Sequence, residues 1–380
     1  MWSPVEKTAL AEAEVEYFDH TSTTIFVAFP VVSTSLAAIE DAAIVIRTTT
    51  PWTMPGNRSI AYGTEIDYVL IEVTGVADDS RVTNGRKLVV AEARLETFLS
   101  ECGITGHEVL DHFKGDAMAG TLCSHPLRGQ GFDFDVPALA ADFATTEEGT
   151  GIVHIAPGHG ADDWVLGMAN SIEVPQTVGE DGCFYEHVPL VAGWHVYKCN
   201  GDVAELLNQA GALMGMGSLV HRYPHSWRSK KPLIFRNTAQ WFISMETNEL
   251  REKALKAIDE TRFVPASGQK RLRGMIADRP DWCVSRQRAW GVPITVFVNK
   301  ETGEPLRDQD VMDRVIAAFE AEGADAWFAS PPERFLGENY NSDDYEQVTD
   351  ILDVWFDSGC THTFVLEDRP ELQWPASLYL

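Results

Sequence analysis

Three hydroxyl-bearing residues in a row, Thr48, Thr49 and Thr50, follow an apolar segment whose composition predicts a β-strand over residues 42–47. Pro51 ends this strand, because a proline fixes its own φ angle and lacks a backbone donor. Threonine hydroxyls both donate and accept hydrogen bonds. The segment therefore predicts a rigid polar rim that suits a polar ligand. A threonine-rich strand end without a ligand is the alternative.

A second group of polar residues, which includes His154 and Asp163, follows another predicted strand at residues 149–157. A lone histidine on an apolar strand is usually a core residue, and an aspartate that begins a helix, here predicted at 162–170, usually caps it. A carboxylate at a pocket edge can instead bind an ammonium group. The intervening glycine-rich turn is no phosphate loop, because it has neither G-x-G-x-x-G nor a Walker lysine. If the two segments converge, they predict a site for an amine-bearing ligand.

The charge of the chain is strongly negative overall, at −27, but unevenly distributed. Residues 222–290 carry 15 Lys and Arg against 7 Asp and Glu, with tryptophans and a tyrosine among them. A basic zone with interleaved aromatic residues is typical of a surface that meets a phosphate backbone or a nucleotide. The alternative is a solvated surface with structural ion pairs.

The composition also predicts a cytoplasmic protein with no membrane partner. The longest apolar run, residues 24–32, is too short to span a bilayer, and the N-terminus lacks the apolar core of a signal peptide. The six cysteines include no C-x-x-C pair, which argues against a disulfide framework and against a zinc site.

Short β-rich runs dominate the chain up to about residue 125, and longer helical patterns appear beyond residue 230. The boundary between these parts is expected near residue 222. Strands are predicted at 13–17, 23–29, 42–47, 66–73, 87–91, 108–113, 233–236 and 293–298, and helices at 92–101, 203–213, 248–260 and 308–322.

Five motifs occur in one order along the chain: residues 10–17 (LAEAEVEY), 48–53 (TTTPWT), 149–154 (GTGIVH), 281–293 (DWCVSRQRAWGVP) and 353–359 (DVWFDSG). Together they resemble the isoleucyl-tRNA synthetases, which are class I aminoacyl-tRNA synthetases. The related valyl and leucyl enzymes typically carry arginine at the position of Thr50.

The resemblance implies an α/β fold in which a β-barrel-like editing domain with flanking helices is inserted into a partial class I, Rossmann-type catalytic domain. Residues 1–21 would connect to the catalytic domain. Residues 22–222 would form the editing (CP1) domain, and residues 223–380 would be the partial catalytic domain, truncated before the K-M-S-K-S loop.

The implied activity is that of an isoleucine–tRNA ligase. Its H-I-G-H and K-M-S-K-S motifs, which stabilise charge on ATP phosphates during adenylation, do not occur in this chain. We therefore expect a fragment that does not aminoacylate and retains at most editing hydrolysis. ATP and Mg²⁺ are cofactors of the full-length family enzyme, whereas editing is expected to need none.

A zinc site of many relatives is expected to be lost here. Those relatives carry a Cys pair just before the first motif and a partner Cys near residue 225. The corresponding residues in this chain are Ser3, Glu6 and Ser226, so no metal ligands are predicted.

Editing is needed because valine and isoleucine differ by one methylene, which a hydrophobic pocket discriminates by only about 1–3 kcal/mol; isoleucyl-tRNA synthetases are the standard example. A second site then hydrolyses mischarged valyl-tRNA(Ile), and valyl-adenylate as a further substrate. By resemblance, Asp163 would bind the α-ammonium group and His154 would exclude isoleucine. The threonines would bind the ester and the terminal adenosine and place water, whereas the general base stays open.

Further site residues follow from the same resemblance. Trp52 and Asn57 would shape the editing pocket, and Trp290 would form a wall of the isoleucine pocket in the catalytic half, with core packing as the alternative for Trp290. The expected partner is tRNA(Ile), and the expected state is a monomer. Two other functions stay open: a non-catalytic tRNA-binding remnant of a broken or cut reading frame, and an amino-acid-binding module without turnover.

Overall fold

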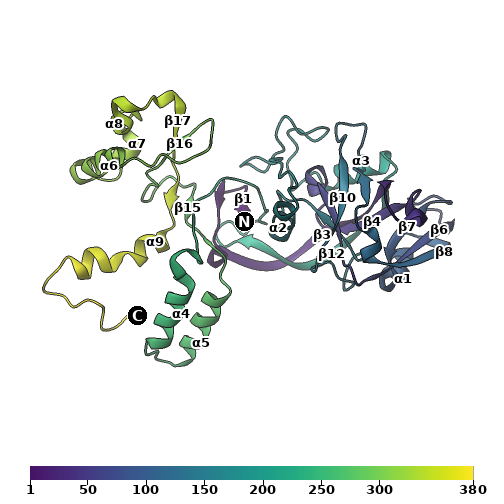
Figure 1. Cartoon of the computed structure of the whole chain (residues 1–380), viewed down its shortest axis with the longest axis horizontal. Coiled ribbons are helices and arrows are strands. Elements are labelled where there is room, and N and C mark those ends of the chain that lie inside the picture. The colour runs from purple at the N-terminus through teal and green to yellow at the C-terminus, as the bar shows by residue number, and fades with distance from the viewer. Residues whose placement is uncertain (380) are drawn as a thin grey trace. The chain divides into compact units, whose positions relative to one another are not determined.

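The computed structural model describes residues 1–379, which form two compact units (Figure 1). The first unit comprises Met1–Lys7 and Glu14–Thr238, and the second comprises Thr8–Ala13 and Ala239–Leu380. Within the described residues, no helix has the length and apolar character needed to cross a bilayer. The protein is thus an α/β chain with a large mixed sheet in its first unit.

The sheet of the first unit has ten strands in the order β12-β3-β9-β10-β5-β11-β4-β7-β6-β8. Their bounds are β3 Val15–Ser33, β4 Ala43–Thr48, β5 Ser59–Tyr62, β6 Asp67–Val76, β7 Lys87–Ala91, β8 Ile104–Lys114, β9 Leu122–Ser124, β10 Asp135–Ala140, β11 Ile152–Ile155 and β12 Leu213–Ser226. An additional pairing of β3 with β4 means that β3, β9, β10, β5, β11 and β4 pair in a closed cycle. The predicted barrel-like form of this domain stays a prediction.

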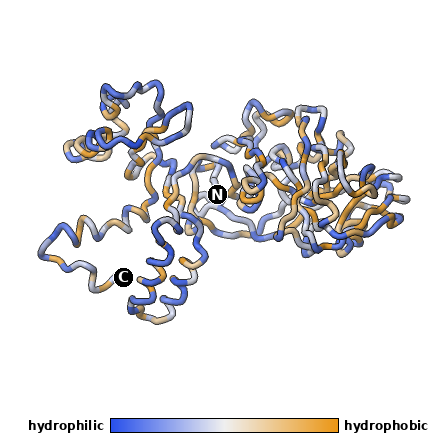
Figure 2. The backbone as a smooth tube through the Cα atoms, viewed as in Figure 1, coloured by the Kyte–Doolittle hydropathy of each residue, from blue (hydrophilic) through white to orange (hydrophobic). Residues whose placement is uncertain are grey.

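The core of the first unit lies where apolar strand residues meet helix α1, Leu95–Glu101. Val45 of β4 and Ala28 of β3 are fully buried there, against Phe98 of α1. Figure 2 shows hydrophobic segments gathered along the strands of this unit. Its other helical segments are η3 Pro51–Gly56, α2 Ala161–Ala169 and α3 Asn200–Gln209.

Strands β3 and β12 form a long antiparallel ribbon, paired from Val15 with Ser226 to Val27 with Leu213. The two strands predicted at 13–17 and 23–29 are therefore one strand. The helix predicted at 203–213 was placed too late, because Leu213 already pairs with β3 as the start of β12. The ribbon runs through both predicted limits of the editing domain, at 22 and 222, and these limits remain predictions.

The second unit combines helices with short strand pairs. Its elements are β2 Thr8–Ala9, β13 Phe242–Ile243, α4 Leu250–Glu260, α5 Ser267–Ala277, β14 Trp282–Cys283, β15 Ser285–Arg286, β16 Phe297–Asn299, α6 Gln309–Glu322, α7 Ala326–Ala329, α8 Glu333–Leu336, β17 Tyr345–Gln347, β18 Ile351–Leu352 and α9 Val354–Gly359. Phe297, Trp327 and Phe335 are fully buried in its core. The predicted strand at 233–236 is only an isolated bridge between Ile234 and Trp2, in the first unit.

Ser3, Glu6 and Ser226, which stand at the expected zinc-ligand positions, lie together in this structure. Glu6 Oε1 accepts hydrogen bonds from Ser226 Oγ at 2.8 Å and from the Ser229 backbone N–H at 3.0 Å. The Ser3 hydroxyl accepts from the Glu6 N–H at 3.3 Å. Burial opposes ionisation of Glu6, but these hydrogen bonds outweigh it and lower the pKa of the carboxyl group. A hydrogen-bonded carboxylate thus occupies the turn, and the predicted loss of zinc stays a prediction.

The motif at residues 353–359 begins with a buried ion pair that joins β15 to β18. Asp353 Oδ2 lies 2.8 Å from Arg286 Nη2, and both side chains are almost fully buried. The same oxygen accepts from Trp282 Nε1 at 3.2 Å, and Oδ1 caps α9 by accepting from the Trp355 N–H.

We expect Asp353→Ala to lower the free energy of unfolding of the second unit by about 3–5 kcal/mol, because it removes one partner of a buried ion pair. Hydrogen exchange of the β15 and β18 amides would measure this loss. The matched control is Glu322→Ala, which removes an exposed ion pair with Arg334 in the same unit and should have little effect. Equal protection of these amides in both variants would contradict this account.

Candidate functional site

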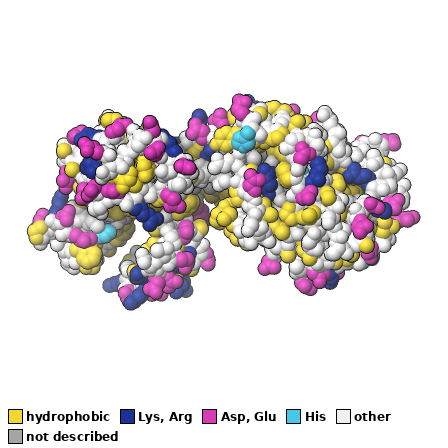
Figure 3. Space-filling view, turned by 45° about the horizontal axis from the view of Figure 1, so that its top comes forward, with side chains coloured by type: hydrophobic (Ala, Val, Ile, Leu, Met, Phe, Trp, Pro, Cys, Tyr) yellow, Lys and Arg dark blue, Asp and Glu magenta, His cyan; other side chains and the backbone are white. Residues whose placement is uncertain are grey.

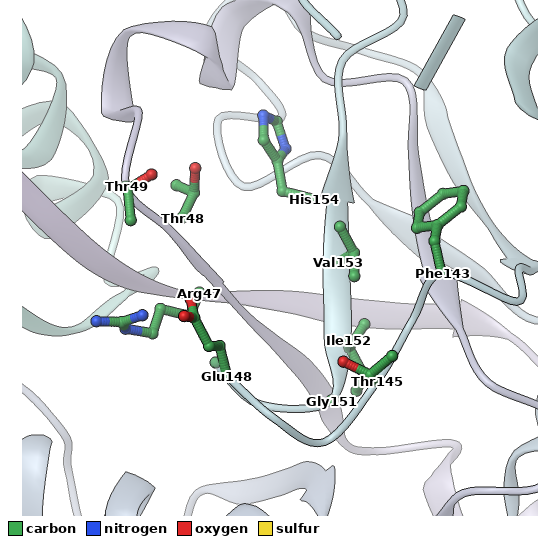
Figure 4. A pocket seen from close by; sticks show the side chains of 11 residues that line it. Arg47, Thr48, Thr49, Phe143, Thr145, Glu148, Gly151, Ile152, Val153 and His154 are labelled. Carbon is green, nitrogen blue, oxygen red and sulfur yellow. The ribbon is translucent and has the colours of Figure 1, made fainter. Parts of the chain in front are cut away.

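The main candidate site lies where β4 and β11 run side by side in parallel, with Val153 opposite Arg47. This register places His154 beside Thr48. A pocket of about 270 Å³ opens there, lined by Arg47, Thr48, Thr49, Phe143, Thr145, Glu148, Gly149, Gly151, Ile152, Val153 and His154. Figure 4 shows Thr48 and Thr49 on one side of His154 and Phe143 on the other. The structure therefore brings three of the predicted site residues into one pocket.

A tight turn at Gly149 and Gly151 directly precedes β11 and positions this strand at the pocket. Both glycines have positive φ angles, 68° and 76°, which residues with a side chain rarely adopt. A Cβ atom at Gly151 would also come within 2.4 Å of the Ala91 Cβ, so only glycine fits. The Tyr68 hydroxyl donates to the Gly151 carbonyl at 2.7 Å. The turn is therefore fixed at its backbone, and with it the position of His154.

The His154 ring is held by hydrogen bonds at both nitrogens. Asn57 Nδ2 lies 2.9 Å from Nδ1, and it also donates to the Ser59 carbonyl at 2.9 Å, which identifies it as the amide nitrogen. The Thr53 hydroxyl donates its one proton to the Thr50 carbonyl at 2.8 Å. It must therefore accept from His154 Nε2, which is 2.9 Å away. The imidazole is thus neutral, with its proton on Nε2.

This arrangement decides what His154 can do. The side chain is buried, and burial is the main reason why its pKa is lowered to about 3, with smaller effects of His125 and His159. Its only acceptor nitrogen is occupied by Asn57, so no lone pair is available to take a proton from water. The geometry therefore holds the His154 ring in place and occupies both of its nitrogens.

The segment behind the rim, η3, is buried along its whole length. The Asn200 side chain accepts from the Trp52 N–H at 3.1 Å, and His125 Nε2 donates to the Met54 carbonyl at 3.1 Å. The His159 ring packs edge-on against Trp52, with the ring centroids 4.8 Å apart. These contacts make η3 a firm support for the threonines.

The other predicted pocket residues near η3 lie around the pocket and do not line it. Asn57 is fully buried and acts through His154. Thr50 and Trp52 line a second cavity of about 270 Å³, which shares only Thr49 with the first. The threonine rim therefore separates two cavities.

Asp163 lies in the first turn of α2 and does not line the first pocket. Its Oδ2 accepts from the Ala156 N–H at 2.7 Å, directly after β11. Burial raises the pKa of this carboxyl group to about 6, the nearby Asp162 adds to the effect, and the hydrogen bond from Ala156 opposes it. Within the described residues Asp163 has no cationic partner, so a ligand ammonium group would supply a missing counter-charge.

Sequence analysis missed several lining residues and misjudged one alternative. Phe143, Thr145 and Glu148 fall in a stretch whose composition indicates only a loop, and only the fold brings them to the pocket. Trp290, in the second unit, is 89% exposed, so the alternative of core packing is wrong for it. Its role as a pocket wall stays a prediction.

Comparisons with known proteins agree with the five motifs. The family model described as tRNA synthetases class I (I, L, M and V) matches residues 1–380. The isoleucine–tRNA ligase of Pelagibacter ubique is 52% identical over 380 residues, covering all of this chain and 42% of that protein. The isoleucine–tRNA ligase of Gluconobacter oxydans is 53% identical over 394 residues, covering all of this chain and 41% of that protein.

A solved structure titled "The crystal structure of GlLeuRS-CP1" aligns with 51% of this chain and 99% of its own, at a TM-score of 0.37 and 12% identity. The chain spans about two fifths of the length of the curated relatives that it matches. The resemblance to isoleucyl-tRNA synthetases is confirmed by the sequence matches: this chain belongs to the class I tRNA synthetases and aligns along its whole length with isoleucine–tRNA ligases.

Proposed function

We propose that the first unit is an editing module that hydrolyses valyl-tRNA(Ile), and valyl-adenylate as a further substrate, within an isoleucine–tRNA ligase. The supporting observation is the pocket that Thr48, Thr49 and His154 share, next to the strand end that holds the Asp163 carboxylate. The proposed module acts in the cytoplasm as a monomer and takes tRNA(Ile) as its partner. Ligation, with ATP and Mg²⁺, is proposed for the whole family enzyme only.

In this proposal, Asp163 binds the α-ammonium group of the substrate. Its carboxylate is desolvated and has one backbone donor, so an approaching cation would form a charge-assisted hydrogen bond in a poorly hydrated place. An uncharged ester alone would leave this carboxylate unpaired. The amino acid ester is therefore preferred over an ester that lacks the amine.

In this proposal, His154 discriminates between the valyl and isoleucyl side chains by their size. Its ring cannot turn aside, because Asn57 and Thr53 hold both nitrogens. Forcing one more methylene into a closely packed space typically costs about 1–3 kcal/mol. A fixed ring wall would thus reject the larger isoleucyl ester.

Hydrolysis itself uses no side-chain base in this proposal. Thr48 Oγ1 already accepts from the Thr50 N–H at 3.1 Å, which leaves its own proton free to bind the ester or a water molecule. The hydroxyl of Thr49 lies in the same pocket. Water would then be activated by the free ribose hydroxyl of the substrate. The competing function, a non-catalytic tRNA-binding module, has the same pocket but no turnover.

The first test is deacylation of valyl-tRNA(Ile) by the purified chain and by Asp163→Ala. Loss of a hydrogen bond to a charged group, about 1.5–3 kcal/mol, should slow the reaction roughly 10- to 150-fold. Asp162→Ala is the control, since it removes the neighbouring exposed carboxylate and should leave the rate unchanged. Hydrolysis no faster than in buffer would favour the non-catalytic function.

The second test is the pH dependence of valyl ester hydrolysis. Asp163 binds the ammonium group only when it is ionised, so kcat/KM should rise between pH 5 and pH 7 with a midpoint near the carboxyl pKa of about 6. His154, with a pKa of about 3, stays neutral and adds no step in this range. The step should vanish in Asp163→Asn, and a step that survives in this variant would refute the assignment.

The third test concerns selectivity. His154→Ala opens the wall of the pocket, so we expect isoleucyl-tRNA(Ile) to be hydrolysed at a measurable rate while valyl-tRNA(Ile) hydrolysis continues. His187→Ala serves as the control, because it removes an exposed histidine of the same unit that does not line the pocket. It should leave the rejection of isoleucyl-tRNA(Ile) unchanged. Retained rejection of the isoleucyl ester in His154→Ala would show that another group sets the size limit.

A further inference from the structure

Helix α5 in the second unit differs in charge from the rest of this acidic chain. It contains three cationic residues and no acidic one, and none of its residues is fully buried. It packs antiparallel to α4 as a helical hairpin. Figure 3 shows Lys and Arg side chains on the lobe that this hairpin forms.

One face of α5 contacts α4, and the opposite face is free. Gln269 donates to the Ile258 carbonyl of α4 at 3.0 Å, and Arg273 pairs with Asp259 at 3.1 Å. In a helix, residues three and four apart share a face. Gly274 therefore shares the opposite face with Lys270 and Arg271.

The cations of this opposite face are available for a partner. Lys270 and Arg271 are exposed and make no ion pair within the described residues, unlike Arg273 on the other face. Ser267, four residues before Arg271, extends the face toward the start of α5. Ala277 is half-buried, and its carbonyl accepts from Arg251 of α4 at 3.0 Å, so it is not part of this face. The exposed Asp278, four residues after Gly274, lies at the end of the face and is its nearest acidic group in sequence.

Gly274 is unexpected in the middle of this helix. Glycine weakens a helix relative to alanine. Apart from its chain neighbours and the adjacent backbone of α5, no atom of the described chain lies within 4 Å of the position that a Cβ at Gly274 would occupy. Packing inside the chain therefore gives no reason for a glycine here. A helix surface without a side chain, one turn after two cations, lets the backbone of a polyanion approach closely.

We propose that the face formed by Ser267, Lys270, Arg271 and Gly274 is a contact surface for the phosphate backbone of RNA. Phosphates neutralise Lys and Arg and release counterions, which supplies affinity without sequence selectivity. The charge of the chain, −27, restricts such contact to its few cationic faces. The choice of tRNA(Ile) as the RNA rests on the proposed function. Binding of RNA to this face does not require that the first unit hydrolyses an ester.

The test is fluorescence anisotropy of labelled tRNA(Ile) with the purified chain over a range of salt concentrations. Lys270→Ala/Arg271→Ala should weaken binding roughly tenfold and reduce the slope of log K against log salt concentration by about 2. The control, Lys253→Ala/Lys256→Ala on α4, makes the same charge change and should keep both values. If tRNA binding were weakened equally in both double variants, the effect would come from net charge alone, and the proposal would be overturned.

Gly274→Ala gives an independent readout. It should raise the melting temperature of the second unit, because alanine favours the helix and has free space, and yet weaken tRNA binding. Wild-type affinity in either α5 variant would overturn the proposal. Hydrolysis of a valyl ester of adenosine alone should be unchanged in all these variants, so a failure of RNA binding and a failure of editing remain distinguishable.

Discussion

The pocket depends on one buried chain of hydrogen bonds, which runs from Asn57 through His154 and Thr53 to the carbonyl of Thr50. Each bond determines the next, because the amide nitrogen occupies one ring nitrogen and so places the proton on the other. The chain links β11 to the segment that follows β4. It therefore fixes the distance between the threonine rim and the histidine ring. The side-chain oxygen of Asn57, Oδ1, is the one atom of this network without a hydrogen-bond partner in the described residues.

The electrostatics of the site follow from burial. Desolvation lowers the pKa of His125 and His159 to about 4 and that of His154 to about 3, and it raises the pKa of Asp163 to about 6. At neutral pH the histidines carry no charge, whereas the carboxylate is ionised. Such surroundings favour a ligand that is neutral except for one cationic group, as an amino acid ester is.

The basic zone at residues 222–290 contains cations in two kinds of surroundings. Some of its cations are structural: Arg286 is buried against Asp353, and Arg251 donates to two carbonyl groups at the end of α5. Others, such as Lys270 and Arg271, face solvent without a partner in the described chain. The alternative of structural ion pairs therefore holds for part of this zone. Contact with a phosphate backbone stays a prediction, and it concerns only the exposed cations.

The sequence by itself determined the family and the strand that leads into the threonines, because these depend on motif order and on local backbone rules. The strand predicted at 149–157 begins only at Ile152, because Gly149 and Gly151 form a turn before it. The sequence could not show that Phe143 and Glu148 join the same pocket, since loops carry no periodic pattern that places them in space. It left His154 open as a base. Only the tertiary structure shows the partners of its two ring nitrogens, because these partners, Thr53 and Asn57, lie some hundred positions away in the chain. The β12 strand was missed for a related reason: its half-exposed, polar sequence forms a strand only because β3 lies beside it.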